Sequence, residues 1–141
     1  MVKDMSEKIK IVTFGVFDYF HYGHLKLFEQ CKQYGNYLIV GVQDDAEILK
    51  RKPNHQIFYN TNQRIEIIKN LRLVDEVFVS KQVELDISKI DFDVLALGED
   101  QNHDGFKFAI EWCNKNNKKI VYLKRTQGIS STLIKENLGK K

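Results

Sequence analysis

One pattern constrains the fold of this chain more than any other: short apolar runs alternate with longer segments of helical spacing. Five runs predict buried strands, at residues 9–14, 37–42, 76–79, 93–98 and 119–123. Uninterrupted apolar runs are typical of strands that are buried on both faces of a parallel sheet. Strands that alternate with helices predict an α/β fold, in which an open parallel sheet of five strands carries helices on both faces.

The segments between these runs predict the helices. Apolar residues recur at helical spacing over residues 25–34, and Gly35 supplies a stop. Further helices are expected at residues 44–49, from Thr61 as an N-cap onward, at 106–117, and at the end of the stretch 124–138. Residues 83–90 fit either a short helix or a loop. Ligands of open parallel sheets bind beyond the carboxyl ends of the strands, so the loops after the first, fourth and fifth strands are expected to meet.

Composition excludes several classes of protein. The 141 residues suit one domain with a single core, and a net charge of +3 is too small and dispersed to indicate a nucleic-acid partner. We expect no membrane segment, because the apolar runs are far too short to span a bilayer. The charged N-terminus has no apolar signal core, which favours a cytoplasmic protein. Cys31 and Cys113 fall at apolar helical positions, so we expect buried thiols rather than a disulfide or a zinc site.

The loop after the first strand has the chemistry of an anion site. His21 and His24 lie three positions apart, with Gly23 between them, directly before a predicted helix. Free backbone N–H groups and the helix dipole attract anions at such a helix start. Two imidazoles can donate hydrogen bonds to the same chain of phosphates, and Gly23 lets the backbone approach closely. We therefore predict that this turn binds phosphate.

A second candidate anion site follows the fifth strand. Residues 124–135 read Lys-Arg-Thr-Gln-Gly-Ile-Ser-Ser-Thr-Leu-Ile-Lys. Gly128 permits a backbone turn, Arg125 supplies a permanent charge, and Ser130, Ser131 and Thr132 offer hydroxyl groups at a helix start. A cluster of three basic residues, Lys50-Arg51-Lys52, lies in a predicted loop at residues 50–56. The cluster fits the binding of anionic substrates, and a solvated basic surface loop is the alternative.

These segments resemble the GxFDxxHxGH and RTxGIST elements of the cytidylyltransferases, a family of the HxGH nucleotidyltransferase superfamily. The similarity extends over nearly the whole chain and includes Arg64 and the stretch Arg72-Leu73-Val74-Asp75-Glu76-Val77. The length is close to that of the bacterial glycerol-3-phosphate cytidylyltransferases, which consist of the catalytic domain alone. The resemblance implies a Rossmann-like fold, with residues 1–141 as a single catalytic domain, and a homodimer.

The resemblance also implies roles for individual residues. Nucleotide binding would fall to Val16, Phe17, His21, Gly23, His24, Lys52, Asp100, Arg125, Thr126, Gly128, Ile129, Ser130, Ser131 and Thr132. Of these, His21, His24, Lys52 and Arg125 would be catalytic. Asp100 would also contact a magnesium ion that accompanies CTP, and Lys50 or Arg51 would meet the phosphate of the acceptor.

The implied reaction joins CTP to a small phosphorylated alcohol, with glycerol 3-phosphate as the first candidate. An ionised phosphate oxygen would attack the α-phosphorus in line and release pyrophosphate, giving the CDP-glycerol used for teichoic acids or capsules. No general base is needed, so catalysis would be positioning and charge stabilisation. An adenylyltransferase is less favoured, because the RTxGIS element is the cytidylyl form.

Two departures leave the acceptor open. Glycerol-phosphate members usually carry threonine where Val16 stands, and the Val16 form is common in phosphocholine and phosphoethanolamine enzymes. In the family, a lysine that helps to bind glycerol phosphate and a nearby tryptophan fall in the region that corresponds to residues 81–89. Here this region is shorter and has Val83 near the tryptophan position. It offers Asp86 or Lys89, and neither is a clear equivalent of the lysine. Phosphocholine, phosphoethanolamine or another polyol phosphate therefore remain alternative acceptors.

Two further features complete the sequence predictions. His55 and His103 lie in polar loops and are expected at the surface, with His103 as a lesser candidate for contacting the acceptor. A non-catalytic nucleotide- or nucleic-acid-binding module is a remote alternative. It would require exposed aromatics within a basic stripe, whereas the aromatics of this chain fall mostly in apolar runs.

Overall fold

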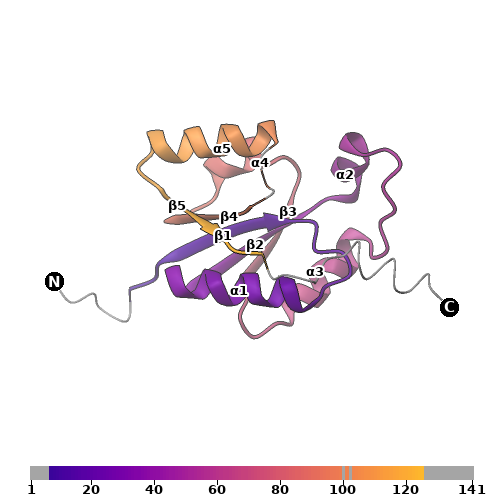
Figure 1. Cartoon of the computed structure of the whole chain (residues 1–141), viewed down its shortest axis with the longest axis horizontal. Coiled ribbons are helices and arrows are strands. Elements are labelled where there is room, and N and C mark those ends of the chain that lie inside the picture. Colours follow the sequence, from indigo (N-terminus) through magenta and orange to yellow (C-terminus); the bar gives the residue numbers. More distant parts are fainter. Residues whose placement is uncertain (1–6, 100, 102, 126–141) are drawn as a thin grey trace.

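A computed structural model describes residues 7–99, 101 and 103–125 of the chain. The elements are β1 (Lys10–Gly15), α1 (Tyr22–Tyr34), β2 (Tyr37–Gln43), α2 (Asp45–Arg51), α3 (Thr61–Lys69), β3 (Glu76–Ser80), α4 (Val83–Asp86), the 3₁₀ turn η1 (Ile87–Lys89), β4 (Val94–Gly98), α5 (Asp104–Lys115) and β5 (Lys119–Leu123). The five predicted strands are therefore all present (Figure 1).

The strands form one open sheet in the order β3-β2-β1-β4-β5, and every neighbouring pair is parallel. The chain first builds outward from β1 through β2 to β3 and then crosses to the other side of β1 for β4 and β5. The strand order thus reverses between the neighbouring strands β1 and β4. Open α/β sheets bind ligands beyond the carboxyl ends of the strands at such a point. The predicted Rossmann-like α/β fold is confirmed.

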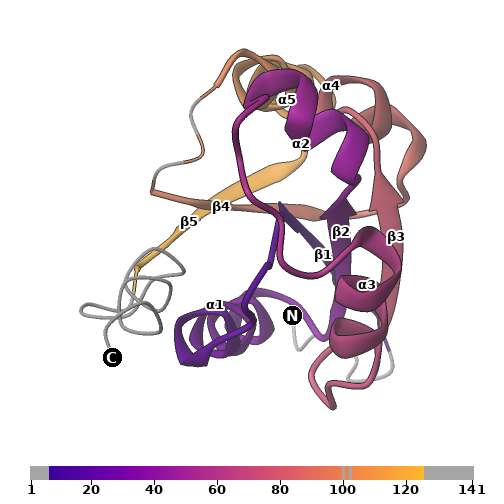
Figure 2. The same ribbon diagram turned by 90° about the vertical axis from the view of Figure 1, so that its right-hand side faces the viewer.

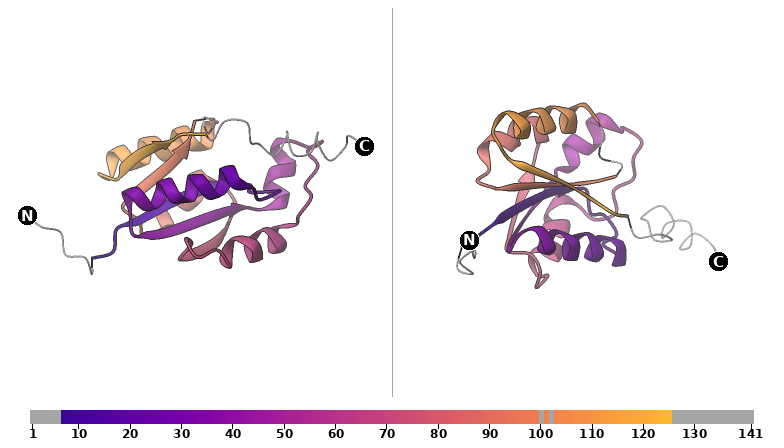
Figure 3. Two further views of the ribbon diagram at one scale, coloured as in Figure 1. Left: turned by 60° about the horizontal axis from the view of Figure 1, so that its bottom comes forward. Right: turned by 60° about the vertical axis from the view of Figure 1, so that its left-hand side comes forward.

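Helices cover both faces of the sheet. Phe28 and Cys31 of α1, with Ile68 of α3, pack on one face, and Phe106 and Cys113 of α5 pack on the other together with α4. Figure 1 shows α1 and α3 below the sheet and α4 and α5 above it, and the turned views of Figure 3 keep this division. Because β1 and β4 are covered on both sides, their side chains are almost entirely buried, as their apolar sequences require.

Histidine caps shift the starts of two helices relative to the sequence prediction. Helix α1 begins at Tyr22 rather than at residue 25, because the His21 side chain caps it. Helix α5 begins at Asp104 rather than at residue 106, because His103 caps it in the same way. Imidazole is not among the usual N-cap groups, so sequence rules do not anticipate either cap.

Two other boundaries also differ from expectation, and one open alternative is decided. Asn60 caps α3, and Thr61, the expected cap, is the first helical residue. Helix α2 continues through Arg51, so Lys50 and Arg51 lie in its last turn and not in a loop. Residues 83–89 adopt the short-helix alternative, as α4 and η1. Within the described chain, no helix has the length and apolar character needed to cross a membrane.

Candidate active site

A cavity with a volume of about 410 Å³ opens at the carboxyl edge of the sheet. The last residue of each of the five strands lines it, namely Gly15, Gln43, Ser80, Gly98 and Leu123. Figure 2 looks onto this edge, with α1 and α3 on one side of the sheet and α2, α4 and α5 on the other. The loops that follow β1, β4 and β5 therefore meet, as the parallel topology predicts.

A conformationally strained turn leads from β1 into the cavity. Phe17 and Tyr19 have positive φ angles of 56° and 49°, which non-glycine residues rarely adopt. The buried carboxylate of Asp18 fixes this turn, since its oxygens accept hydrogen bonds from the backbone N–H groups of Phe58 (2.7 Å) and Tyr59 (2.9 Å). The turn is thereby fastened to the segment that leads into α3, although the two are far apart in the sequence.

His21 and His24 form a stacked pair at the start of α1. Their ring centroids are 3.8 Å apart and their planes are inclined by 20°. Nδ1 of His21 accepts the N–H of Gly23 at 3.0 Å, and Nδ1 of His24 accepts the N–H of His21 at 3.3 Å. Since both Nδ1 atoms accept, the neutral rings carry their protons on Nε2. Both side chains line the cavity, so the pair offers it two N–H donors.

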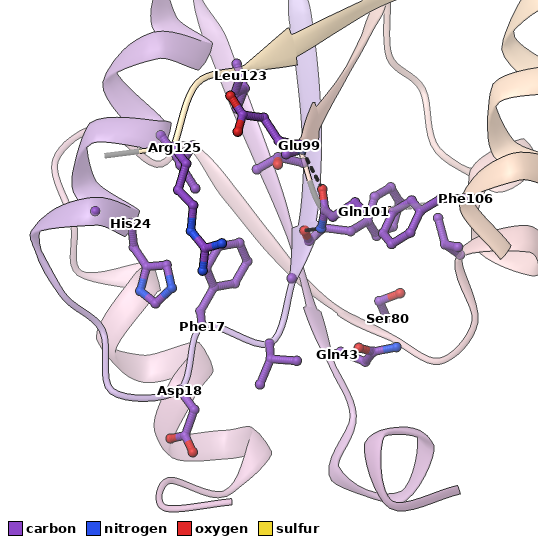
Figure 4. A pocket seen from close by; sticks show the side chains of 18 of the residues that line it. Phe17, Asp18, His24, Gln43, Ser80, Glu99, Gln101, Phe106, Leu123 and Arg125 are labelled. Carbon is purple, nitrogen blue, oxygen red and sulfur yellow. Dashed lines mark hydrogen bonds between the residues drawn. The ribbon is translucent and has the colours of Figure 1, made fainter. Parts of the chain in front are cut away.

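Electrostatics favour the neutral form of both rings. Burial lowers the pKa of His24 to about 3, and the adjacent His21 contributes to the shift. Burial also lowers the pKa of His21, with the positive charge of Arg125 as the second cause. At neutral pH the imidazoles are therefore dipolar donors rather than cations. The permanent charge beside them belongs to Arg125, which lines the same side of the cavity (Figure 4).

A fully buried arginine joins the ends of two central strands. Arg64 of α3 donates to the carbonyl oxygens of Val16 (2.8 Å), Gln43 (2.7 Å) and Tyr59 (3.0 Å), and it also pairs with the carboxylate of Asp45. Its charge is compensated by this set of acceptors, as a buried cation requires. Arg64 thus fixes the loop after β1 relative to the end of β2.

Gln101 links β1 and β4, the two strands between which the strand order reverses. Its Nε2 donates to the carbonyl of Phe14 at 2.6 Å, and its Oε1 accepts from the N–H of Gly98 at 2.9 Å. The side chain therefore bridges the ends of β1 and β4 at the cavity wall (Figure 4). Sequence reasoning did not assign Gln101 or Asp18 an individual role, although Asp18 is the aspartate of the GxFDxxHxGH element and both residues lie three positions after the end of a strand.

The structure brings together most of the described residues predicted for the site. Those lining the cavity are Val16, Phe17, His21, Gly23, His24, Arg51, Lys52 and Arg125. Within the described chain Lys50 is not part of this lining, and its ammonium group pairs with Glu47 at 3.1 Å. The predicted residues Asp100, Thr126, Gly128, Ile129, Ser130, Ser131 and Thr132 lie outside the described residues.

A magnesium ion would depend on few protein ligands. Within residues 7–99, 101 and 103–125, no three His, Cys, Asp or Glu side chains are grouped to hold a metal. Glu99 lines the cavity immediately before Asp100. Mg²⁺ commonly keeps several waters and uses one or two carboxylates together with substrate phosphates. The described donors therefore fit an ion that arrives with a nucleotide better than a permanent metal centre, and the role of Asp100 stays a prediction.

The segment 81–89 has mainly structural contacts. Lys81 pairs with Asp44 at 2.6 Å, and Asp86 accepts hydrogen bonds from Ser80 Oγ and from the N–H of Lys81. Of this segment, Val83 lines the cavity. The position that resembles the family's tryptophan is thus at the cavity wall, as an aliphatic side chain.

The fold and the cavity define a nucleotidyltransferase-type α/β protein, in which a histidine pair and several cations converge beyond the carboxyl ends of parallel strands. Comparison with known proteins agrees: residues 12–137 match the family described as cytidylyltransferase-like. The chain belongs to this family of nucleotidyltransferases.

The similar proteins include two kinds of named enzyme. The glycerol-3-phosphate cytidylyltransferase of Bacillus spizizenii is 40% identical over 133 residues, which cover 92% of this chain and 96% of the relative. The FAD synthase of Thermococcus sibiricus is 37% identical over 120 residues, covering 82% of this chain and 80% of the relative. A solved lipopolysaccharide core biosynthesis protein from Thermoplasma volcanium shares the fold, with a TM-score of 0.69, 24% identity, and coverage of 85% and 98% of the two chains.

Proposed function

We propose that this chain transfers the cytidylyl group of CTP to glycerol 3-phosphate, giving CDP-glycerol and pyrophosphate. The observation that carries the proposal is the convergence of two neutral imidazole donors and Arg125 on one side of a cavity that also contains Arg51 and Lys52. Such a cavity suits two anionic substrates that must approach each other. The 40% identity to a glycerol-3-phosphate cytidylyltransferase supports the choice of substrates.

In the proposed mechanism, the acceptor's phosphate oxygen attacks the α-phosphorus in line, and pyrophosphate leaves. His21 and His24 donate through Nε2 to the triphosphate, where negative charge builds up on the leaving group. Arg125 adds permanent positive charge beside the triphosphate, and Lys52 adds it where the two anionic substrates meet. Mg²⁺, held by phosphate oxygens and Asp100, would neutralise part of the triphosphate charge.

Neutral histidines suit this role because a donor that is already protonated on Nε2 needs no proton transfer during the reaction. The stacked geometry and the two Nδ1 hydrogen bonds hold the donors in place before substrate binds. Preorganised donors of this kind contribute most when they are withdrawn from water, and His24 is largely buried.

FAD synthesis is a second candidate, because FAD synthases are among the relatives at 37% identity. It would join an adenylyl group from ATP to FMN. Both reactions use a phosphate as nucleophile, so the same cations would serve. The cavity wall at Val83 and Phe106 is apolar and does not by itself distinguish the two acceptors.

The test is a matrix of nucleotides and acceptors read by pyrophosphate release. CTP and ATP are each paired, with magnesium, with glycerol 3-phosphate, phosphocholine, phosphoethanolamine and FMN. The proposal predicts that CTP with glycerol 3-phosphate gives the highest kcat/KM. A higher value for ATP with FMN would replace it with FAD synthesis, and turnover with none of the pairs would contradict both.

A further inference from the structure

The cavity has two sides, and the second carries a histidine that resembles His21 in its local structure. Figure 4 shows His24, Arg125 and Phe17 grouped on one side, with Phe106 and Ser80 on the other. His103 packs against Phe106, Val83 belongs to the same apolar cluster as Phe106, and Arg51 is hydrogen-bonded to Gln43, so these residues and the nearby Lys52 belong to the second side. This side combines apolar walls from α4 and α5 with four nitrogen-bearing side chains, those of Gln43, Arg51, Lys52 and His103.

His103 is held in the same way as His21. Each is the N-cap of a helix, each is followed two residues later by glycine, and each accepts that glycine's N–H on Nδ1, at 3.1 Å for His103 and Gly105. With Nδ1 occupied as an acceptor, the proton of neutral His103 resides on Nε2. The ring packs against Phe106, with centroids 4.5 Å apart, which restricts its orientation.

Arg51, in the last turn of α2, and Lys52, the residue after this helix, lie close enough to His103 to influence its pKa. Burial lowers the pKa of His103, and the charges of Arg51 and, more weakly, Lys52 lower it further. Arg51, Lys52 and His103 line the same cavity, and the carboxylates of Glu84 and Asp104 act on the imidazole as well, in the direction that raises its pKa.

We propose that His103 binds the phosphate of the acceptor together with Arg51 and Lys52, while His21 and His24 serve the nucleotide. This proposal rests on the proposed function and assigns the second side of the cavity to a phosphomonoester. Two donors and a fork-shaped guanidinium suit a phosphate with three terminal oxygens. The carbon body of the acceptor would then lie against Val83 and Phe106.

Two conservative variants separate phosphate binding from helix capping. His103→Asn retains a side-chain oxygen near the position of Nδ1, and asparagine is a favoured N-cap, so α5 should stay intact. It cannot reach the position of Nε2. His103→Gln places an amide donor near that position. Lys107→Gln, on the exposed surface of α5, is the matched control.

Kinetics give the first readout. His103→Asn should raise KM for the acceptor about tenfold, corresponding to the loss of one hydrogen bond to a charged group. KM for CTP should change less than twofold, and His103→Gln should recover part of the loss. An acceptor KM within twofold of wild type, or an equal rise in KM for CTP, would overturn the proposal.

A binding measurement decides the proposal even if no acceptor supports turnover. The full chain, labelled with ¹⁵N at histidine, is titrated with inorganic phosphate and with glycerol 3-phosphate, and the His103→Asn variant identifies the signal of residue 103. Saturable movement of that signal, retained in Lys107→Gln, supports phosphate binding. A stationary His103 signal overturns it, whereas failure of turnover alone contradicts only the proposed function.

Discussion

The guanidinium group of Arg64 donates a hydrogen bond of 2.8 Å to the carbonyl oxygen of Val16, and the arginine side chain is completely buried. Val16 opens the turn that carries His21 and His24, whereas Arg64 belongs to α3. The same guanidinium bonds to the carbonyl of Gln43 at the end of β2. A helix on one face of the sheet therefore determines where the β1 turn lies at the cavity.

Replacing Arg64 should destabilise the fold. Arg64→Met leaves three carbonyl oxygens, those of Val16, Gln43 and Tyr59, without this buried donor and removes the ion pair with Asp45, and we expect the free energy of unfolding to fall by about 3 kcal/mol. Urea denaturation measures this change. Arg72→Met is the control, because Arg72 is exposed and a surface replacement should stay within about 0.5 kcal/mol. Equal effects of the two variants would contradict the role of Arg64.

The carboxylate of Asp18 should be needed to anchor the segment before α3. Asp18→Ala removes the acceptor for the N–H groups of Phe58 and Tyr59, and we expect a loss of about 2 kcal/mol in the free energy of unfolding. Amide hydrogen exchange should accelerate at these two residues before it does in the sheet. Asp91→Ala, at an exposed position, serves as the control. Unchanged protection of Phe58 and Tyr59 would show that other contacts hold the segment.

The free energy of unfolding should depend on pH because the pKa of His24 is lowered in the folded protein. Its pKa is about 3 in the folded protein and about 6.5 in an unfolded chain, so between these values the unfolded state binds the extra proton. Stability due to this group is therefore full above pH 6.5 and falls as the pH drops toward 3. In His24→Asn the unfolding free energy should decline less steeply over this range, because the contribution of His24 is removed while other groups with lowered pKa values, such as His21, His103 and Asp44, still contribute in the same direction. Identical slopes in the two proteins would contradict a neutral, buried His24.

Gly41 should tolerate no side chain in the middle of the sheet. It is the register partner of Phe14 on one side and of Phe78 on the other, and an added Cβ would lie 2.7 Å from an atom of each ring. Gly41→Ala should therefore cost about 1–3 kcal/mol through overpacking. Introducing Phe78→Leu makes room, so thermal unfolding of the double variant should show less destabilisation than the sum of the single changes. Simple additivity would argue that the rings do not restrict the glycine.

The strand pattern and the parallel sheet follow from local sequence, because central strands such as β1 and β4 are buried on both faces and must be apolar throughout. The meeting of the β1, β4 and β5 loops follows from the same topology. The sequence therefore predicts that His21, Gly23 and His24 lie at the start of a helix at this edge of the sheet, and the structure confirms it.

Other parts of the site depend on contacts that no local pattern encodes. Arg64 is a charged residue on an amphipathic helix, where the sequence alone favours exposure, and only the carbonyls converging around it explain its burial. His103 reads as part of a polar loop, because imidazole is not among the usual N-cap groups, although its contacts with Gly105 and Phe106 are local. Lys50 and Arg51 look equivalent in sequence, yet the last turn of α2 places Arg51 on the cavity wall.

The central claim is that the Nε2–H groups of a preorganised histidine pair stabilise the negative charge of the departing pyrophosphate. It is tested most directly by the rate of pyrophosphate release from CTP and glycerol 3-phosphate, with magnesium, in wild type and in His24→Asn. Asparagine can still accept the N–H of His21, so a folded variant that lacks only the donor is expected, and circular dichroism checks this. The account predicts that kcat falls by about 10²–10³. A folded His24→Asn enzyme that turns over at the wild-type rate would contradict it.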